Sequence, residues 1–291
     1  MGTDATQAPG WAFLSIIDWP TGWDLDQKLR AVVGASGLDP FLMQQRVLKP
    51  APCVIHRMNA FDAAQAVESL RGMGVVAFAP TDAELRGIGE PALIKNIARD
   101  GDALVIEAWR SGQVVALRGA AVYLVIRSAI AIRRRSTPPA PADLDYRTVH
   151  FNTSLEGLII DTSFAAAAAA SQSASQNAPA SSYAPSEYVH RIEVFTRDGS
   201  WFRVDSEKFA WLCLGGERTV SSTTNAELLM KLFSESFSGA ILDRGFEHFS
   251  GPEELIHPVI KRAPMGTHLD AVYEFYTRWA LLMYRRLTAP R

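Results

Sequence analysis

The chain has 291 residues, of which 48% are hydrophobic and 21% are charged, and its formal net charge is −2 at pH 7. This length suits about two domains with buried cores, and the near-neutral charge excludes a global field that attracts nucleic acid or anionic membranes. Two cysteines, Cys53 and Cys213, exclude a disulfide framework and lack metal-type spacing, so a cytoplasmic location is expected.

The first nine residues, 1–9, are expected to be disordered and lack the basic flank and apolar run of a signal peptide. Their "MGTDAT" matches the short N-myristoylation pattern, which we interpret as a chance match. The most apolar run, 120–132, is interrupted by Arg127 and is shorter than the roughly 20 residues that span a bilayer. It is therefore predicted to be a buried strand.

Residues 10–82 are predicted to form a β-α-α-β-α-β module. "WAFLSIIDW" has the aromatic and β-branched content of a strand, and "DLDQKLRAVVGAS" has apolar residues at helical spacing. Gly37 can end that helix with a positive φ, Asp39 can cap the next helix, and Pro40 suits its first position. A strand, a helix capped by Asp62 and a last strand follow.

Several of these segments resemble the C-terminal domain of the bacterial ribosomal stalk protein, whose wider fold class includes the adaptor of the Clp protease. The matching segments are Gly37-Leu38, Ala51-Pro52, "PCVIHRM", "DAAQAVESLRGMG" and "VVAFA". The resemblance implies that family's fold over about a quarter of the chain. It does not extend to the basic docking face, because Val33, Phe41 and Gln44 stand where the family has Arg or Lys.

Residues 83–101 are expected to form a connecting helix or linker. Residues 102–250 change to a strand pattern, with hairpin turns at Ser111-Gly112 and Asp198-Gly199. A capping box from Thr224 to Glu227 then opens an amphipathic helix. Strands closed by one helix look like a pleckstrin-homology-like barrel, a resemblance of element order only.

A low-complexity segment, 163–186, interrupts the 102–250 domain and is expected to be a mobile insertion that proteases cut readily. Residues 251–291 are expected to form a tail and an amphipathic helix that begins near Thr267. One face of that helix carries four large side chains that could be core or a partner-helix surface for a homo-oligomer. These candidates are Val272, Tyr276, Trp279 and Met283.

No linear motif marks a catalytic centre: nucleophile-elbow, phosphate-loop and dinucleotide-binding patterns are all absent from the sequence. The six histidines lack metal-ligand spacing, so neither a metal nor a cofactor is expected. Gly215-Gly216 with Arg218 is interpreted as a plain turn, with an anion-binding nest as the alternative. Both cysteines are expected to be buried thiols.

The arginines Arg127, Arg133, Arg134 and Arg135 are the one notable charge cluster and are candidate anion-binding residues. The alternative is a solvated strand end that protects a sheet edge.

We therefore expect an α+β protein in which a small β-α-α-β-α-β module precedes a mostly antiparallel, barrel-like domain with C-terminal helices. The expected function is non-catalytic protein–protein interaction or scaffolding, with another protein as the partner and no nucleic acid. The first alternative is binding to a membrane surface or an anionic ligand through the arginine cluster. The second is an enzyme whose site has no linear motif.

Overall fold

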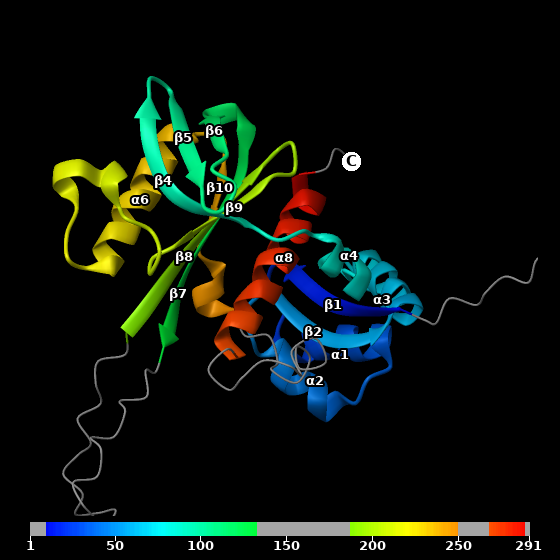
Figure 1. Cartoon of the computed structure of the whole chain (residues 1–291). Coiled ribbons are helices and arrows are strands. Elements are labelled where there is room, and N and C mark those ends of the chain that lie inside the picture. The colour runs from blue at the N-terminus through cyan, green and yellow to red at the C-terminus, as the bar shows by residue number, and fades with distance from the viewer. Residues whose placement is uncertain (1–9, 133–186, 250–267, 289–291) are drawn as a thin grey trace, which may run out of the picture. The chain divides into compact units, whose positions relative to one another are not determined.

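The computed structural model describes residues 10–132, 187–249 and 268–288 (Figure 1). All of these residues except Ile132 and Glu187 belong to one compact unit. The predicted disordered segment 1–9, the insertion 163–186 and the arginines 133–135 lie outside the described residues. The α+β class is confirmed, since helices accompany one sheet of three strands and one of seven.

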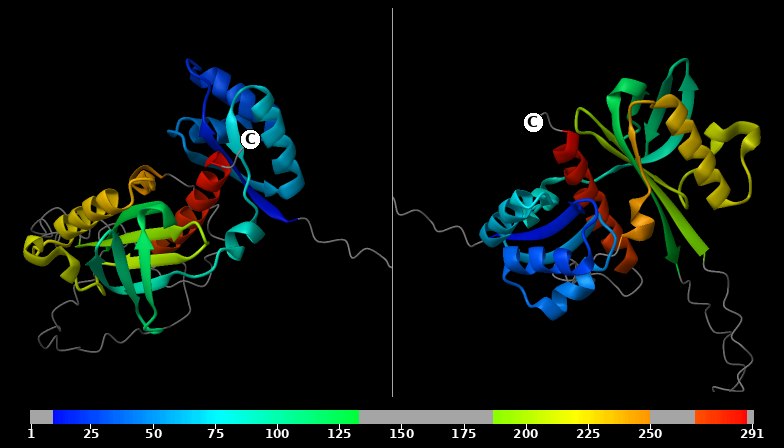
Figure 2. Two further views of the ribbon diagram at one scale, coloured as in Figure 1. Left: turned by 90° about the horizontal axis from the view of Figure 1, so that it is seen from above. Right: turned by 180° about the vertical axis from the view of Figure 1, so that it is seen from behind.

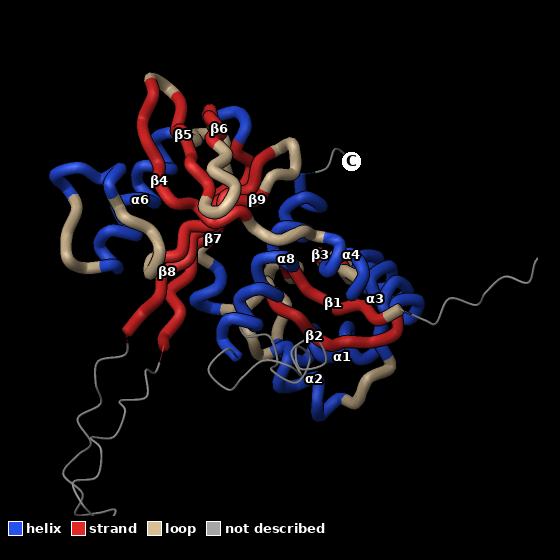
Figure 3. Tube along the Cα trace, in the orientation of Figure 1, coloured by secondary structure: helices blue, strands red, loops and turns tan. Residues whose placement is uncertain are grey.

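The first sheet and its helices follow the predicted β-α-α-β-α-β order. The elements are β1 (Trp11–Asp18), α1 (Leu25–Ser36), α2 (Pro40–Val47), β2 (Cys53–Asn59), α3 (Ala60–Gly72) and β3 (Val76–Phe78). The strands pair antiparallel in the order β2-β1-β3 (Figure 3). We call this part the three-stranded module.

Local signals determine where the helices of this module begin and end. Gly37 follows α1 with a φ of 66°, and Pro40 opens α2 behind Asp39, whose side chain accepts from two backbone N–H groups. These three predictions are confirmed. The predicted cap of α3 was wrong, because Asn59 caps a helix that starts before Asp62. An asparagine oxygen satisfies the first free N–H groups as well as a carboxylate does.

The alternation of side chains along β1 gives this strand two buried faces. Leu14 and Ile16 join α1 and α3 in a core with Val32 and Leu70. Because neighbouring residues of a strand point to opposite sides, Phe13 lies on the other face and belongs to a different core. The three-stranded module is therefore covered from both sides.

The second sheet has the strand order β10-β7-β8-β9-β4-β5-β6. Its strands are β4 (Ala92–Asp100), β5 (Ala103–Ala108), β6 (Val114–Arg118), β7 (Val122–Ile132), β8 (Glu187–Thr196), β9 (Trp201–Asp205) and β10 (Ile241–Asp243). The remaining elements are α4 (Asp82–Gly87), α6 (Ser222–Ser236), α8 (His268–Thr288), and the 3-10 helices η1 (Gly119–Ala121), η2 (Leu212–Glu217) and η3 (Gly245–His248). Two further views show these elements from above and behind (Figure 2).

The two predicted hairpins are confirmed. β5 and β6 pair antiparallel around Gly112, and β8 and β9 pair antiparallel around Gly199, whose φ is 93°. The sheet is more mixed than expected, because β10 runs parallel to β7 and β4 runs parallel to β9.

The connecting helix expected over 83–101 is only partly present. Helix α4 ends at Gly87, and 92–100 forms β4 instead. The pairing of β4 with β5 shifts between Ile94 and Asn96, so Ile94 and Ile97 both point into the core although they are three residues apart. A β-bulge therefore gives this strand an apolar spacing close to that of a helix.

Helix α6 packs its apolar face on the larger sheet, but it starts earlier than predicted. Its cap is Ser221, whose side chain accepts from the N–H of Thr224, so the predicted capping box at Thr224 was wrong. Asn225 bonds back to both the N–H and the carbonyl of Thr219. These hydrogen bonds hold Thr219 against the first turn of α6. The helix is therefore capped at Ser221, three residues before the predicted cap at Thr224.

Helix α8 is not part of a separate tail, because it packs against both sheets. The rings of Phe13 and Phe275 lie 4.8 Å apart, and Nε1 of Trp279 donates to Oγ of Ser15 at 3.0 Å. The partner-helix candidates Tyr276, Trp279 and Met283 are buried, and Val272 is partly buried against the same core. This face is covered by the chain itself and is not open to a second copy. Among the helices in the described ranges, none has the length and apolarity to cross a membrane.

Candidate functional site

A buried polar network joins α8 to the hairpin of β8 and β9. Glu193 has no exposed surface, and its Oε1 accepts hydrogen bonds from Nε of Arg203 at 2.5 Å and from the hydroxyl of Tyr273 at 2.8 Å. Its Oε2 accepts from Nε1 of Trp201 at 2.6 Å. Arg203 also pairs with Glu274 of α8. Both oxygens of Glu193 are therefore engaged by donors from the protein.

The electrostatics of the network follow from burial and pairing. Burial raises the pKa of Glu193, and Arg203 opposes this rise. Burial lowers the pKa of Arg203, but Glu193 and Glu274 together raise it by more than burial lowers it. The guanidinium therefore stays charged. A carboxylate with every oxygen occupied and no solvent contact is placed to fix its neighbours. We conclude that Glu193 positions Trp201.

A second polar contact fixes α8 to the edge of the same sheet. The hydroxyl of Tyr276 donates to Asp243 of β10 at 2.7 Å, and the N–H of Gly245 donates to the same carboxylate at 2.6 Å. Burial raises the pKa of Asp243, and these two hydrogen bonds partly offset the rise. The contact orients α8 at a point remote from Glu193 in the sequence.

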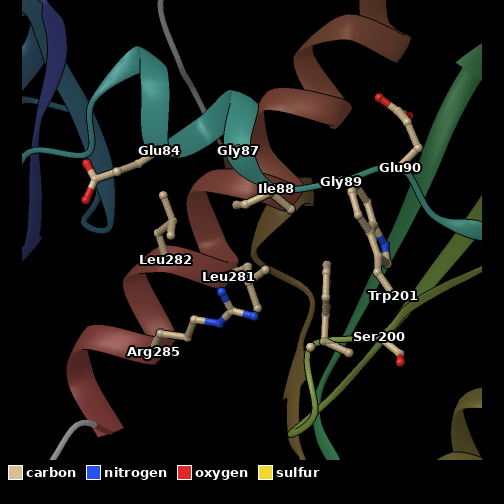
Figure 4. Close-up of a pocket in the computed structure, with 12 residues that line it drawn as sticks. Glu84, Gly87, Ile88, Gly89, Glu90, Ser200, Trp201, Leu281, Leu282 and Arg285 are labelled. Atoms are coloured by element: carbon tan, nitrogen blue, oxygen red, sulfur yellow. The ribbon is translucent and has the colours of Figure 1, made fainter.

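Trp201 also forms one wall of a groove with a volume of about 480 Å³ (Figure 4). Three segments line it: α4 with the chain that follows it, the hairpin of β8 and β9, and the C-terminal half of α8. Its apolar walls and its one cationic residue come from Ile88, Phe195, Trp201, Leu281, Leu282 and Arg285. We call it the Arg285 groove.

The apolar walls of the Arg285 groove are held firmly. The rings of Phe195 and Trp201 stack with centroids 5.2 Å apart, and both are almost fully buried, as is Leu281. Trp201 is fixed further by its hydrogen bond to Glu193. A groove with rigid aromatic and aliphatic walls is largely preformed, as ligand-binding sites usually are.

The charges around the groove are unevenly compensated. Glu84 is held by the backbone N–H of Thr81 at 2.7 Å, and Glu90 pairs with Arg278 at 2.9 Å. In Figure 4 both carboxylates point away from Arg285, whose guanidinium extends along the groove beside Leu281. Within the described ranges, Arg285 forms no hydrogen bond or ion pair with another side chain. The groove therefore presents an uncompensated positive charge next to apolar walls.

The structure places the other candidate residues in surroundings that differ from those the sequence predicted. Arg127 is 3% exposed and pairs with Glu227, so it has no surface to offer to an anion. Gly215, with a φ of 52°, and Arg218 line an open hollow. Cys53 is buried as predicted, whereas Cys213 is only partly buried; both are free thiols, and burial raises the pKa of each to about 11.

No metal cluster is present among the residues whose positions are described: no group of three or more His, Cys, Asp or Glu side chains is arranged to hold an ion.

Sequence reasoning missed the Arg285 groove because its walls come from three distant segments. The only sequence signal was that Arg285 lies in the last turn of an amphipathic helix, where a cation also suits the helix dipole. In comparisons with family models, with curated proteins and with solved structures, no match to this chain was found. The resemblances to the ribosomal stalk domain and to a pleckstrin-homology-like barrel thus stay expectations.

Proposed function

We propose that this is a non-catalytic interaction protein and that the Arg285 groove binds a partner protein. The observation that carries the proposal is the combination of rigid apolar walls with one uncompensated arginine. Protein-binding surfaces favour aromatic residues and arginine over other charged groups, because these bury large areas and pair with carboxylates. Arg285 is exposed at the groove, which Trp201 lines together with the partly exposed Ile88 and Leu282.

A catalytic role finds less support in the same groove. General acid–base chemistry needs a titratable group within reach of a bound substrate. The two carboxylates at the groove, Glu84 and Glu90, are engaged by Thr81 and Arg278 and face outward (Figure 4). Binding through the proposed anion cluster also lacks support in the described part of the chain, because Arg127 is committed to Glu227.

A cytoplasmic location is part of the proposal. It is supported by Cys53 and Cys213, which are unpaired. Burial raises the pKa of both thiols to about 11, so they stay neutral well above pH 7, and a neutral thiol packs as a small apolar group.

Site-specific photo-crosslinking tests the proposed binding site. A photoreactive phenylalanine analogue is placed at Leu282, inside the groove, or at Leu212, an exposed position on η2 that serves as the control. After irradiation in an extract of the cells that make the protein, we expect a discrete protein adduct from position 282 alone. The Arg285→Glu change should abolish that adduct. Equal labelling at both positions, or none at 282, would refute the proposal.

A further inference from the structure

We propose that the Arg285 groove binds the C-terminal end of its partner polypeptide, with the terminal carboxylate at Arg285 and the last, apolar side chain against the groove walls. This inference rests on the proposed function and narrows it to one class of ligand. Three features of the groove carry it: the position of its charge, the backbone that borders it, and its rigidity.

The position of the charge sets the chemistry of the ligand. In Figure 4 the guanidinium of Arg285 lies beside Leu281, and the partly exposed Ile88 and Leu282 line the same groove. A ligand must therefore place a negative charge and an apolar group side by side. A C-terminal residue does this, because its carboxylate and its side chain share one Cα atom. An internal Asp or Glu instead puts the charge where the apolar side chain is needed. Arginine can hold a carboxylate through two parallel hydrogen bonds.

The backbone bordering the groove can pair with an extended peptide. Ile88 follows α4 with φ −74° and ψ 117°, which is a strand-like conformation. In the described structure, the backbone N–H groups of Ile88, Gly89 and Glu90 donate no backbone hydrogen bond. A Cβ atom placed on Gly87 or Gly89 would meet nothing within 4 Å. A peptide can thus approach these free groups closely, as in recognition by strand addition.

The groove is also fixed in place before a ligand binds. The ring of Trp201 is held by Glu193, and Glu90, at the end of the bordering segment, pairs with Arg278 of α8 at the surface. Arg278 also lies over the ring of Trp201, with 5.7 Å between its guanidinium carbon and the ring centroid. Preformed walls lower the entropy lost on binding, so a short peptide end can bind with useful affinity.

Two matched pairs of variants make the test specific. Arg285→Gln removes the proposed carboxylate partner, and Arg286→Gln removes the adjacent exposed arginine of the same helix turn. Gly89→Leu fills the groove border, and Gly34→Leu adds the same side chain on the exposed side of α1. A Cβ at either glycine meets nothing within 4 Å, and neither has a positive φ, so all four variants should fold. Circular dichroism checks this.

The probe is a fluorescein-labelled library of hexapeptides that end in Leu, Ile, Val or Phe with a free carboxylate, and binding is followed by fluorescence anisotropy. We expect a subset to bind. Because a charged hydrogen bond contributes about 1.5–3 kcal/mol, C-terminal amidation or Arg285→Gln should weaken binding roughly tenfold or more. Gly89→Leu should weaken it similarly, whereas Arg286→Gln and Gly34→Leu should leave it unchanged.

The outcomes separate this inference from the proposed function. If amidated peptides bind as well as free acids, the terminal carboxylate is not recognised and the inference fails. If N-acetylleucine binds as tightly as the peptides, the groove is a small-molecule site and the inference also fails. If no peptide binds but position 282 still cross-links to a protein, only the inference fails. If neither occurs, the proposed function fails with it.

Discussion

The three-stranded module and the larger sheet bury polar groups to very different extents. Among the described residues of the module, Ser15 is the only buried polar side chain, and Trp279 of α8 donates to it. The larger sheet and the helices α6 and α8 bury many more. These are Arg127, Ser128, His190, Glu193, Thr196, Arg203, Asp205, Asn225, Asp243 and Thr277. The module is specified by shape and apolar contact, whereas the larger sheet is also specified by buried polar pairs such as Arg203 with Glu193 and Tyr276 with Asp243.

The largest effect should follow from breaking the buried network. Replacing Glu193 with Ala leaves Arg203 buried beside an empty space, and loss of one member of a buried ion pair costs about 3–5 kcal/mol. We expect that decrease in the free energy of unfolding by urea denaturation.

The matched control for this variant is Glu235→Ala. Glu235 pairs with Arg99 at 3.3 Å on the surface, where such pairs contribute about 1 kcal/mol or less. Similar losses for both variants would mean that the buried network is no more important than a surface pair.

A smaller loss is expected from a cavity in the apolar module. Leu14 is fully buried between β1 and its covering helices, and Leu→Ala changes at such positions typically cost about 3 kcal/mol. Because no ionisable group is added or removed, the loss should be equal at pH 5 and pH 7. Leu48→Ala, at an exposed position, should change the unfolding free energy by about 0.5 kcal/mol or less. A pH-dependent loss for Leu14→Ala would contradict the conclusion that the module is specified by shape and apolar contact.

The smallest effect concerns pH. Burial lowers the pKa of His190, and nearby Arg127 lowers it further, while Glu227 and Glu247 oppose this. The unfolded chain keeps the ordinary pKa near 6.5, so it takes up a proton first as the pH falls. The contribution of His190 to the free energy of unfolding is therefore fully present above pH 6.5 and is lost as the pH falls below 6.5.

His190→Gln removes this contribution while leaving a polar partner for Thr223, which lies 3.0 Å from Nε2. Wild type should therefore lose more unfolding free energy than the variant between pH 7 and pH 5. The difference is at most about 1.4 kcal/mol per pH unit for one proton. His56→Gln is the matched variant in the three-stranded module, since burial also lowers the pKa of His56. Identical pH profiles for wild type and His190→Gln would show that His190 does not titrate differently on folding.

The fold could be predicted at several places where local chemistry decides the structure. Gly37, Asp39 and Gly199 mark helix ends and a hairpin turn that need no distant partner. Prediction failed where distant contacts decide. The bulge in β4 brings Ile94 and Ile97 to one side of a strand, so its apolar spacing looks helical. Only the neighbouring strands make that segment extended.

The candidate site was beyond prediction for a related reason. The amphipathic pattern of α8 identified Trp279 as a core or partner residue, but spacing alone does not say which surface a helix covers. The Arg285 groove forms only once α8 packs against the segments that line the groove with it. Its cation was not among the candidate arginines, because arginines in the last turn of a helix are common and have a simpler explanation in the helix dipole.

The hydrogen bond between Trp279 and Ser15 joins residues 264 positions apart in the chain. During synthesis, the ribosome therefore completes β1 long before it makes the helix that shields Phe13 and Ser15. Until α8 emerges, this face of the nascent module stays uncovered and is a natural target for chaperones. The speed at which α8 docks after release should then limit how soon newly made molecules become resistant to aggregation.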